Sequence, residues 1–134
     1  MKKVILNTLV ASLFGLLLFI GCDKAVDAED IDKVVIPEKN VSYGKYIHPV
    51  LNLKCATSGC HNDESRAAGY SVNTWSSTRT PGIVNPGDGQ TSTLVWVIEG
   101  TVAGRNMPPF GYPPLNQNQI NGIKQWILEG ALNN

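Results

Sequence analysis

The sequence has few of the residues that most often carry chemistry, with two histidines, two methionines and three cysteines among 134 residues. Acidic and basic residues balance, at eleven of each, and loss of Lys2 and Lys3 with a cleaved leader would leave a net charge of −2. Such a weak charge implies no nucleic-acid partner. A zinc site would need a fourth ligand, and no second Cys/His cluster supplies one. Asp63 and Glu64 are adjacent carboxylates, but sequence neighbours rarely converge on one reacting atom, so we expect no enzyme.

The one long apolar run covers residues 4–20 and predicts an export signal. It follows Lys2 and Lys3 and is near the lower limit of a membrane span, about 20 residues. Phe19-Ile20-Gly21-Cys22 resembles the lipobox of bacterial lipoproteins. We therefore predict a lipoprotein signal peptide over residues 1–21 and lipidation of Cys22. The protein would then be lipid-anchored to a bacterial membrane of the cell envelope, facing the periplasm or the cell exterior. An uncleaved anchor helix is the alternative.

Residues 22–40 are predicted to be the lipidated cysteine followed by a flexible acidic tether. Acidic residues outnumber lysines there, and the only apolar stretch is Val34-Val35-Ile36, which Pro37 follows at once. Such a composition favours an extended, largely unstructured chain. The folded unit would then be one small domain over residues 41–134. Fewer than 100 residues give a thin core, which a buried apolar cofactor would support.

The first predicted helix of this domain begins after Ser42 as N-cap and includes Tyr46 and Ile47. Pro49 should end it, because the residue before a proline is disfavoured in helical geometry. Residues 93–98 suit either a strand or a helix opened by Ser92, and periodicity does not decide between them.

The clearest element is the last helix. Asn116 followed three residues later by Gln119 is a capping-box pattern. An apolar face then recurs at helical spacing, at Ile120, Ile123, Trp126, Ile127 and Ala131. This face is assigned to the core, and no chemistry is assigned to Trp126.

The motif Cys55-Ala-Thr-Ser-Gly-Cys60-His61 suits covalent haem. Two thiols can add to the two vinyl groups at one edge of the porphyrin, and the adjacent imidazole can bind the iron. The usual spacing places two residues between the cysteines, whereas here there are four. Ser58-Gly59 is flexible enough to let the longer loop bulge away from the macrocycle. The competing interpretation is a haem-free surface binding module, in which Cys55 and Cys60 form a disulfide.

A haem iron bound by His61 needs a second axial ligand, for which Met107 is the best candidate. It lies in Asn106-Met107-Pro108-Pro109, where two prolines restrict the backbone. His48 is the weaker candidate. His/Met ligation fills both axial positions and favours electron transfer; a sensor of diatomic ligands, with Met107 dissociating, is a further possibility.

Two further contacts with the haem are expected. Arg105 is the preferred donor to a propionate, ahead of Arg79, Trp96 and Tyr112. The proximal imidazole should donate its other nitrogen to the carbonyl of Pro81 or Pro86.

Taken together, these features resemble the small monohaem c-type cytochromes, in particular the planctomycete-type cytochrome c domain. The matching segments are residues 46–51 leading to Cys55, the pair Cys60-His61, residues 84–88 with Ser92 and Leu94, residues 107–109 and residues 126–131.

The resemblance implies an all-α fold, a small cytochrome c-like helical domain with long loops wrapped around one covalent haem. The first and last helices would pack together, and residues 93–98 would be helical. Cys55 and Cys60 would form the thioethers, His61 would be the proximal ligand and Met107 the distal one. The cofactor would be haem c with its iron. The function would be one-electron transfer to a redox protein partner, with no small-molecule substrate evident.

Overall fold

The computed structural model describes residues 30–134, whose regular structure is helical. The elements are η2 (Ile31–Lys33), η3 (Tyr43–Ile47), α2 (His48–Lys54), η4 (Ala67–Gly69), α3 (Trp75–Thr78), α4 (Thr93–Glu99) and α5 (Gln117–Leu128). Within these residues no strand is found, only an isolated bridge between Asn85 and Asp88. The predicted all-α class is therefore confirmed.

The predicted signal peptide and Cys22 lie outside the described residues. Across residues 30–134, no helix combines the length and hydropathy that a membrane span requires.

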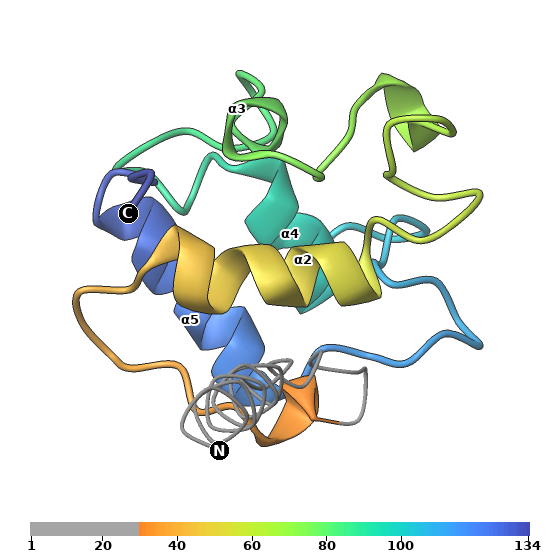
Figure 1. Cartoon of the computed structure of the whole chain (residues 1–134). Coiled ribbons are helices and arrows are strands. Elements are labelled where there is room, and N and C mark those ends of the chain that lie inside the picture. The colour runs from red at the N-terminus through yellow and green to blue at the C-terminus, as the bar shows by residue number, and fades with distance from the viewer. Residues whose placement is uncertain (1–29) are drawn as a thin grey trace, which may run out of the picture.

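The core forms where α5 packs against η3 and α4 (Figure 1). Ile123, Trp126 and Ile127 of α5 are fully buried, as is Ile47 of η3. The Trp126 ring lies 5.3 Å from the ring of Tyr43, between centroids. Each large apolar side chain buried in this way contributes about 1.5–3 kcal/mol. The predicted apolar face of the last helix thus packs against the first helical segment.

The first helical segment continues through Pro49, so the predicted break there is wrong. His48 has helical angles, φ −58° and ψ −46°. The preceding η3 is a π-helical turn, in which the His48 N–H donates to the Tyr43 carbonyl. Pro49 then falls in the first turn of α2, where a missing N–H costs little. As a result α2 continues to Lys54, and Cys55 lies at its C-terminal end.

The two later helices begin as the sequence suggested, with one difference. Residues 93–98 are helical, but the Ser92 hydroxyl does not cap α4; it donates to the Asp88 carbonyl at 2.7 Å. The capping box of α5 is confirmed, because Asn116 and Gln119 each accept the other's backbone N–H.

Residues 30–40, here called the strap, pack against the domain where a flexible tether was expected. Ile31 and Ile36 are 1% and 2% exposed. The Ile36 N–H donates to Asn118 Oδ1 at 2.8 Å, and Asn118 Nδ2 donates back to the Ile36 carbonyl at 3.0 Å. The acidic composition of the segment favoured a tether, but it does not show that these two isoleucines are buried. Their burial and the paired backbone groups of Ile36 offset the entropy of ordering the segment. Within the described residues, the packed unit therefore includes residues 31–40, which the sequence assigned to the tether.

Glu129, just after α5, binds the C-terminal end of the strap through hydrogen bonds. Its carboxylate accepts the N–H groups of Asn40 and Val41, both at 2.8 Å, and the Gln125 amide at 2.9 Å. The Gln125 hydrogen bond is the largest cause that holds the pKa of Glu129 below its usual range, with the two backbone donors adding to it.

Gly122→Ala tests whether the strap is part of the fold. The new Cβ would lie 2.6 Å from Ile36 Cγ2 and 3.0 Å from Ile36 Cβ. The gain in helix propensity of about 1 kcal/mol is smaller than the upper cost of overpacking, about 3 kcal/mol. We expect a displaced strap, faster limited proteolysis near Ile36 and a lower melting temperature.

Gly89→Ala is the matched control, because its Cβ meets only Leu128 Cδ2, at 3.8 Å. Equal protease resistance of the strap in the two variants would contradict the packing of Ile36 on α5.

Glu129→Gln should destabilise the domain by about 1–2 kcal/mol at neutral pH, because two strap donors lose a charged acceptor. The folded pKa is depressed, so the carboxylate's contribution is complete above the unfolded value of about 4.3 and is lost as pH falls through the folded pKa. The difference in unfolding free energy between wild type and variant should therefore shrink below about pH 4. Denaturant titrations across this range measure it, with the exposed strap residue changed in Glu38→Gln as control. A difference independent of pH would rule out this role for the charge.

Candidate functional site

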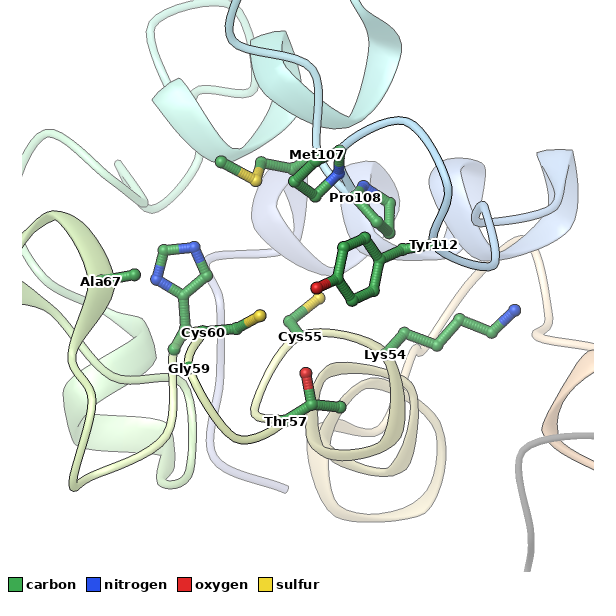
Figure 2. Close-up of a pocket in the computed structure, with 11 residues that line it drawn as sticks. Lys54, Cys55, Thr57, Gly59, Cys60, Ala67, Met107, Pro108 and Tyr112 are labelled. Carbon is green, nitrogen blue, oxygen red and sulfur yellow. The ribbon is translucent and has the colours of Figure 1, made fainter.

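A cavity opens between the Cys55–His61 motif and the loop that follows α4. Cys55, Cys60 and His61 line it together with Met107 and Pro108. Figure 2 shows Met107 and Pro108 on the opposite side of the cavity from the two cysteines. The other lining residues are Lys54, Thr57, Gly59, Ala67, Pro109 and Tyr112.

His61 is fixed by its backbone and by one aromatic neighbour. Its N–H donates to the Cys55 carbonyl at 3.0 Å, and its carbonyl accepts the Val72 N–H at 2.9 Å. The imidazole is 6% exposed and stacks on the Tyr70 ring, with centroids 4.4 Å apart and planes 17° apart. Tyr70 lies in a long loop, where neither periodicity nor a motif pointed to it.

The buried Nδ1 of His61 has no hydrogen-bond partner. The expected bond from the imidazole to the carbonyl of Pro81 or Pro86 is therefore not found. An unpaired buried polar atom costs about 1–3 kcal/mol, and such a cost marks positions with a use other than stability. A buried imidazole with an unsatisfied nitrogen suits a site that receives a metal-containing group.

Cys55 and Cys60 are free thiols that both reach the cavity. Cys55 follows the last turn of α2, where its N–H donates to the Leu51 carbonyl at 2.9 Å. Burial, reinforced by the neighbouring Cys60, raises the pKa of the Cys55 thiol to about 12. Between the cysteines the chain turns at Gly59, whose φ of 81° lies in the left-handed region that glycine adopts readily.

The two candidates for distal ligand lie in different places. Met107 lines the cavity, and its N–H donates to the Val97 carbonyl of α4 at 2.9 Å. His48 does not line the cavity; its Nε2 is hydrogen-bonded to the Asn73 carbonyl at 2.9 Å. The tertiary structure therefore brings the thioether of Met107, not the imidazole of His48, to the motif.

Arg105 is exposed and does not line the cavity, contrary to its predicted role as propionate donor. Arg79 lies over the Trp75 ring, and Trp96 donates its indole N–H to the Gln90 carbonyl at 2.6 Å. Of the four donors considered, only Tyr112 reaches the cavity. Lys54 reaches it as well, and the only sequence signal for it was its place directly before Cys55.

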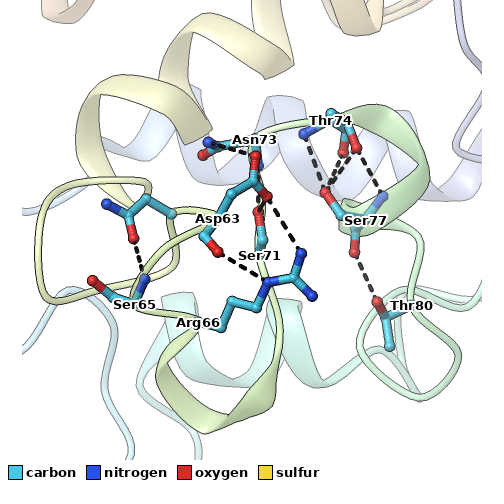
Figure 3. Close-up of polar contacts among 9 residues, drawn as sticks. Asp63, Ser65, Arg66, Ser71, Asn73, Thr74, Ser77 and Thr80 are labelled. Atoms are coloured by element: carbon cyan, nitrogen blue, oxygen red, sulfur yellow. Dashed lines mark hydrogen bonds and ion pairs between the residues drawn. The ribbon is translucent and has the colours of Figure 1, made fainter.

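The loop after His61 is held by Asp63 (Figure 3). Its carboxylate accepts the Ser71 hydroxyl at 2.7 Å and the Asn73 amide at 3.1 Å. Arg66 Nε donates to the Asp63 carbonyl at 3.1 Å. These bonds order the segment that carries Tyr70, so Asp63 acts on the loop and forms no pair with Glu64.

In the haem-free protein the Cys55 thiol should react slowly with a disulfide reagent. A pKa of about 12 leaves a thiolate fraction at pH 8 on the order of a thousandfold below that of an ordinary cysteine, with pKa about 8.5. The rate measured in Cys60→Ser should keep rising beyond pH 10. A plateau near pH 9 would show that Cys55 is not buried as described.

Residues 58–111 match the family model described as Planctomycete cytochrome C. The matched segment contains Cys60, His61 and Met107 and begins after Cys55. Neither the curated proteins nor the solved structures include a match to the chain. The match confirms the resemblance to the planctomycete-type cytochrome c domain, a family that implies haem binding and electron transfer rather than catalysis.

Proposed function

We propose that the protein is a one-electron carrier with one covalently attached c-type haem in the described cavity. Cys55 and Cys60 would form the thioethers, His61 would be the proximal ligand and Met107 the distal one. The observation that carries the proposal is that Met107 lies across the cavity from Cys55 and Cys60, and that His61 lines the same cavity. A thioether and an imidazole that line one cavity are the ligand set of a haem that transfers electrons.

The residues present fit this cofactor. Both cysteines are free, and attachment needs reduced thiols, because each S–H adds across a vinyl C=C bond without net oxidation. His61 offers a buried imidazole with an unpaired nitrogen. Bound haem would supply an iron that gains or loses one electron.

The protein's contribution is rigidity around that iron. Tyr70 fixes the plane of the imidazole, and the bond to Val97 together with Pro108 and Pro109 restricts the backbone at Met107. A weak thioether ligand depends on such a restricted loop, because its bond to iron cannot order a mobile one. With both axial positions filled, oxygen chemistry and sensing are disfavoured.

We further propose that lipid on Cys22 holds this domain at a membrane of the cell envelope, where it exchanges electrons with a redox protein. Only residues 23–29 separate Cys22 from the strap. Seven residues span at most about 25 Å when fully extended. An anchored domain would therefore stay close to the lipid surface, closer than a tether reaching to residue 40 would allow.

The cofactor assignment is tested by maturing the protein in a host with cytochrome c assembly machinery. We expect a c-type pyridine haemochrome spectrum and a mass gain of one haem. Met107→Ala should abolish the weak red absorption band of a Met–iron bond, and His48→Gln should retain it, because His48 faces Asn73.

Protein without haem, in which Cys55 and Cys60 are found as a disulfide, would refute the proposal and leave the haem-free surface module. Loss of the band in His48→Gln but not in Met107→Ala would refute the assignment of the distal ligand.

A further inference from the structure

We propose that Lys54, held by Asp32 of the strap, is a positioning residue that fixes the Met107 loop against the wall formed by the Cys-His motif. This inference rests on the proposed function, in which Met107 is an iron ligand.

Lys54 is a lysine whose side chain is almost completely enclosed. Its side chain is 3% exposed, and it lines the cavity directly before Cys55. The ammonium lies 2.6 Å from Asp32 Oδ1 and donates to the Pro114 carbonyl at 3.0 Å. In Figure 2 it points away from the sulfur of Cys55. Lysine is rarely buried unless it is paired. Here the side chain lines the cavity, but the Asp32 and Pro114 atoms that its ammonium contacts do not.

The two contacts join three segments that are distant in sequence. Lys54 ends α2, Asp32 belongs to η2 of the strap, and Pro114 ends the loop that carries Met107. The cavity thus has two walls, the motif wall of residues 55–61 and the Met107 wall of residues 107–114. The Lys54 side chain connects the two.

Asp32 is itself held in place, so it can act as an anchor. Its carboxylate also accepts the buried Gln119 amide at 3.0 Å, and its carbonyl accepts the Asn116 amide at 3.2 Å. Both donors belong to the capping box that starts α5. The carboxylate that holds Lys54 is thus fixed to the capped start of α5.

The Met107 loop has few other attachments. The Met107 N–H is bonded to Val97 of α4, and Leu115 is buried after the loop. Between them, the bond from Lys54 is the only hydrogen bond within the described residues that ties residues 108–114 to another part of the domain. Phe110 at the tip is fully exposed, and Tyr112 is 57% exposed. This bond is therefore the polar link between the loop and the motif.

Loss of the ammonium should free residues 108–114 and weaken the bond between Met107 and iron. Lys54→Met keeps an apolar stem along the cavity and removes both contacts. Asp32→Asn keeps the lysine and removes its charged acceptor. Lys124→Met is the matched control, because it removes a different lysine–carboxylate pair, with Glu99, away from the cavity.

The measurement is imidazole binding to the ferric, haem-loaded full chain, because imidazole competes with Met107 for iron. We expect Lys54→Met to bind imidazole about tenfold more tightly than wild type, the factor that corresponds to 1.4 kcal/mol. Asp32→Asn should shift in the same direction by less. Lys124→Met should leave the imidazole affinity unchanged, and its only expected effect is a lower melting temperature.

Unchanged imidazole affinity in both Lys54→Met and Asp32→Asn, with normal haem content, would overturn the inference. An equal shift in Lys124→Met would overturn it too, because the effect would then be one of general stability. If Lys54→Met does not fold, Asp32→Asn alone decides. Failure of the proposed function is seen separately, as absence of haem from the wild-type protein or a red band that survives Met107→Ala.

Discussion

The burial of one face of α5 is the interaction on which the rest of the structure depends. Ile123, Trp126 and Ile127 are buried where α5 packs against η3 and α4. Both ends of α5 also hold the strap. Asn118, near the start of the helix, binds Ile36, and Glu129, just after its end, binds Asn40. In a domain of this size, a single well-packed helix supplies much of the apolar burial, so the surrounding elements are ordered by their contact with it.

The two walls of the cavity depend on this core in different ways. The motif wall continues α2 directly, so the position of Cys55 follows from the packing of that helix. The Met107 wall is attached to α4 by one backbone bond and to α2 by one lysine. The first wall therefore continues a packed helix, whereas the second is a loop with two hydrogen bonds to other elements, beside the packing of Met107 and Leu115 on the core.

The restriction found on both sides of the cavity suits the proposed electron carrier. An iron that changes only its charge needs ligands that stay in place, and stacking on Tyr70 together with the proline-rich loop restricts both sides. The unpaired Nδ1 of His61 is a cost to the haem-free fold. Such a cost is consistent with a side chain that serves a bound group, and among the residues that line the cavity it falls on His61.

The sequence by itself determined the features that depend on near neighbours. The capping box at Asn116 and Gln119, the apolar face of α5 and the Cys60-His61 pair are patterns within a few residues, and each is found where expected. Met107 was identified because it is scarce and flanked by prolines, and these properties are also visible in the sequence.

Only the tertiary structure decided which distant groups meet. The strap is ordered by Asn118 and Gly122, the helix passes Pro49 because a π-helical turn precedes it, and His48 turns to Asn73. Arg105 remains exposed, whereas Lys54 is enclosed by residues from two other segments. Composition and periodicity describe one segment at a time. Burial and charge pairing depend on partners that only the folded chain brings together.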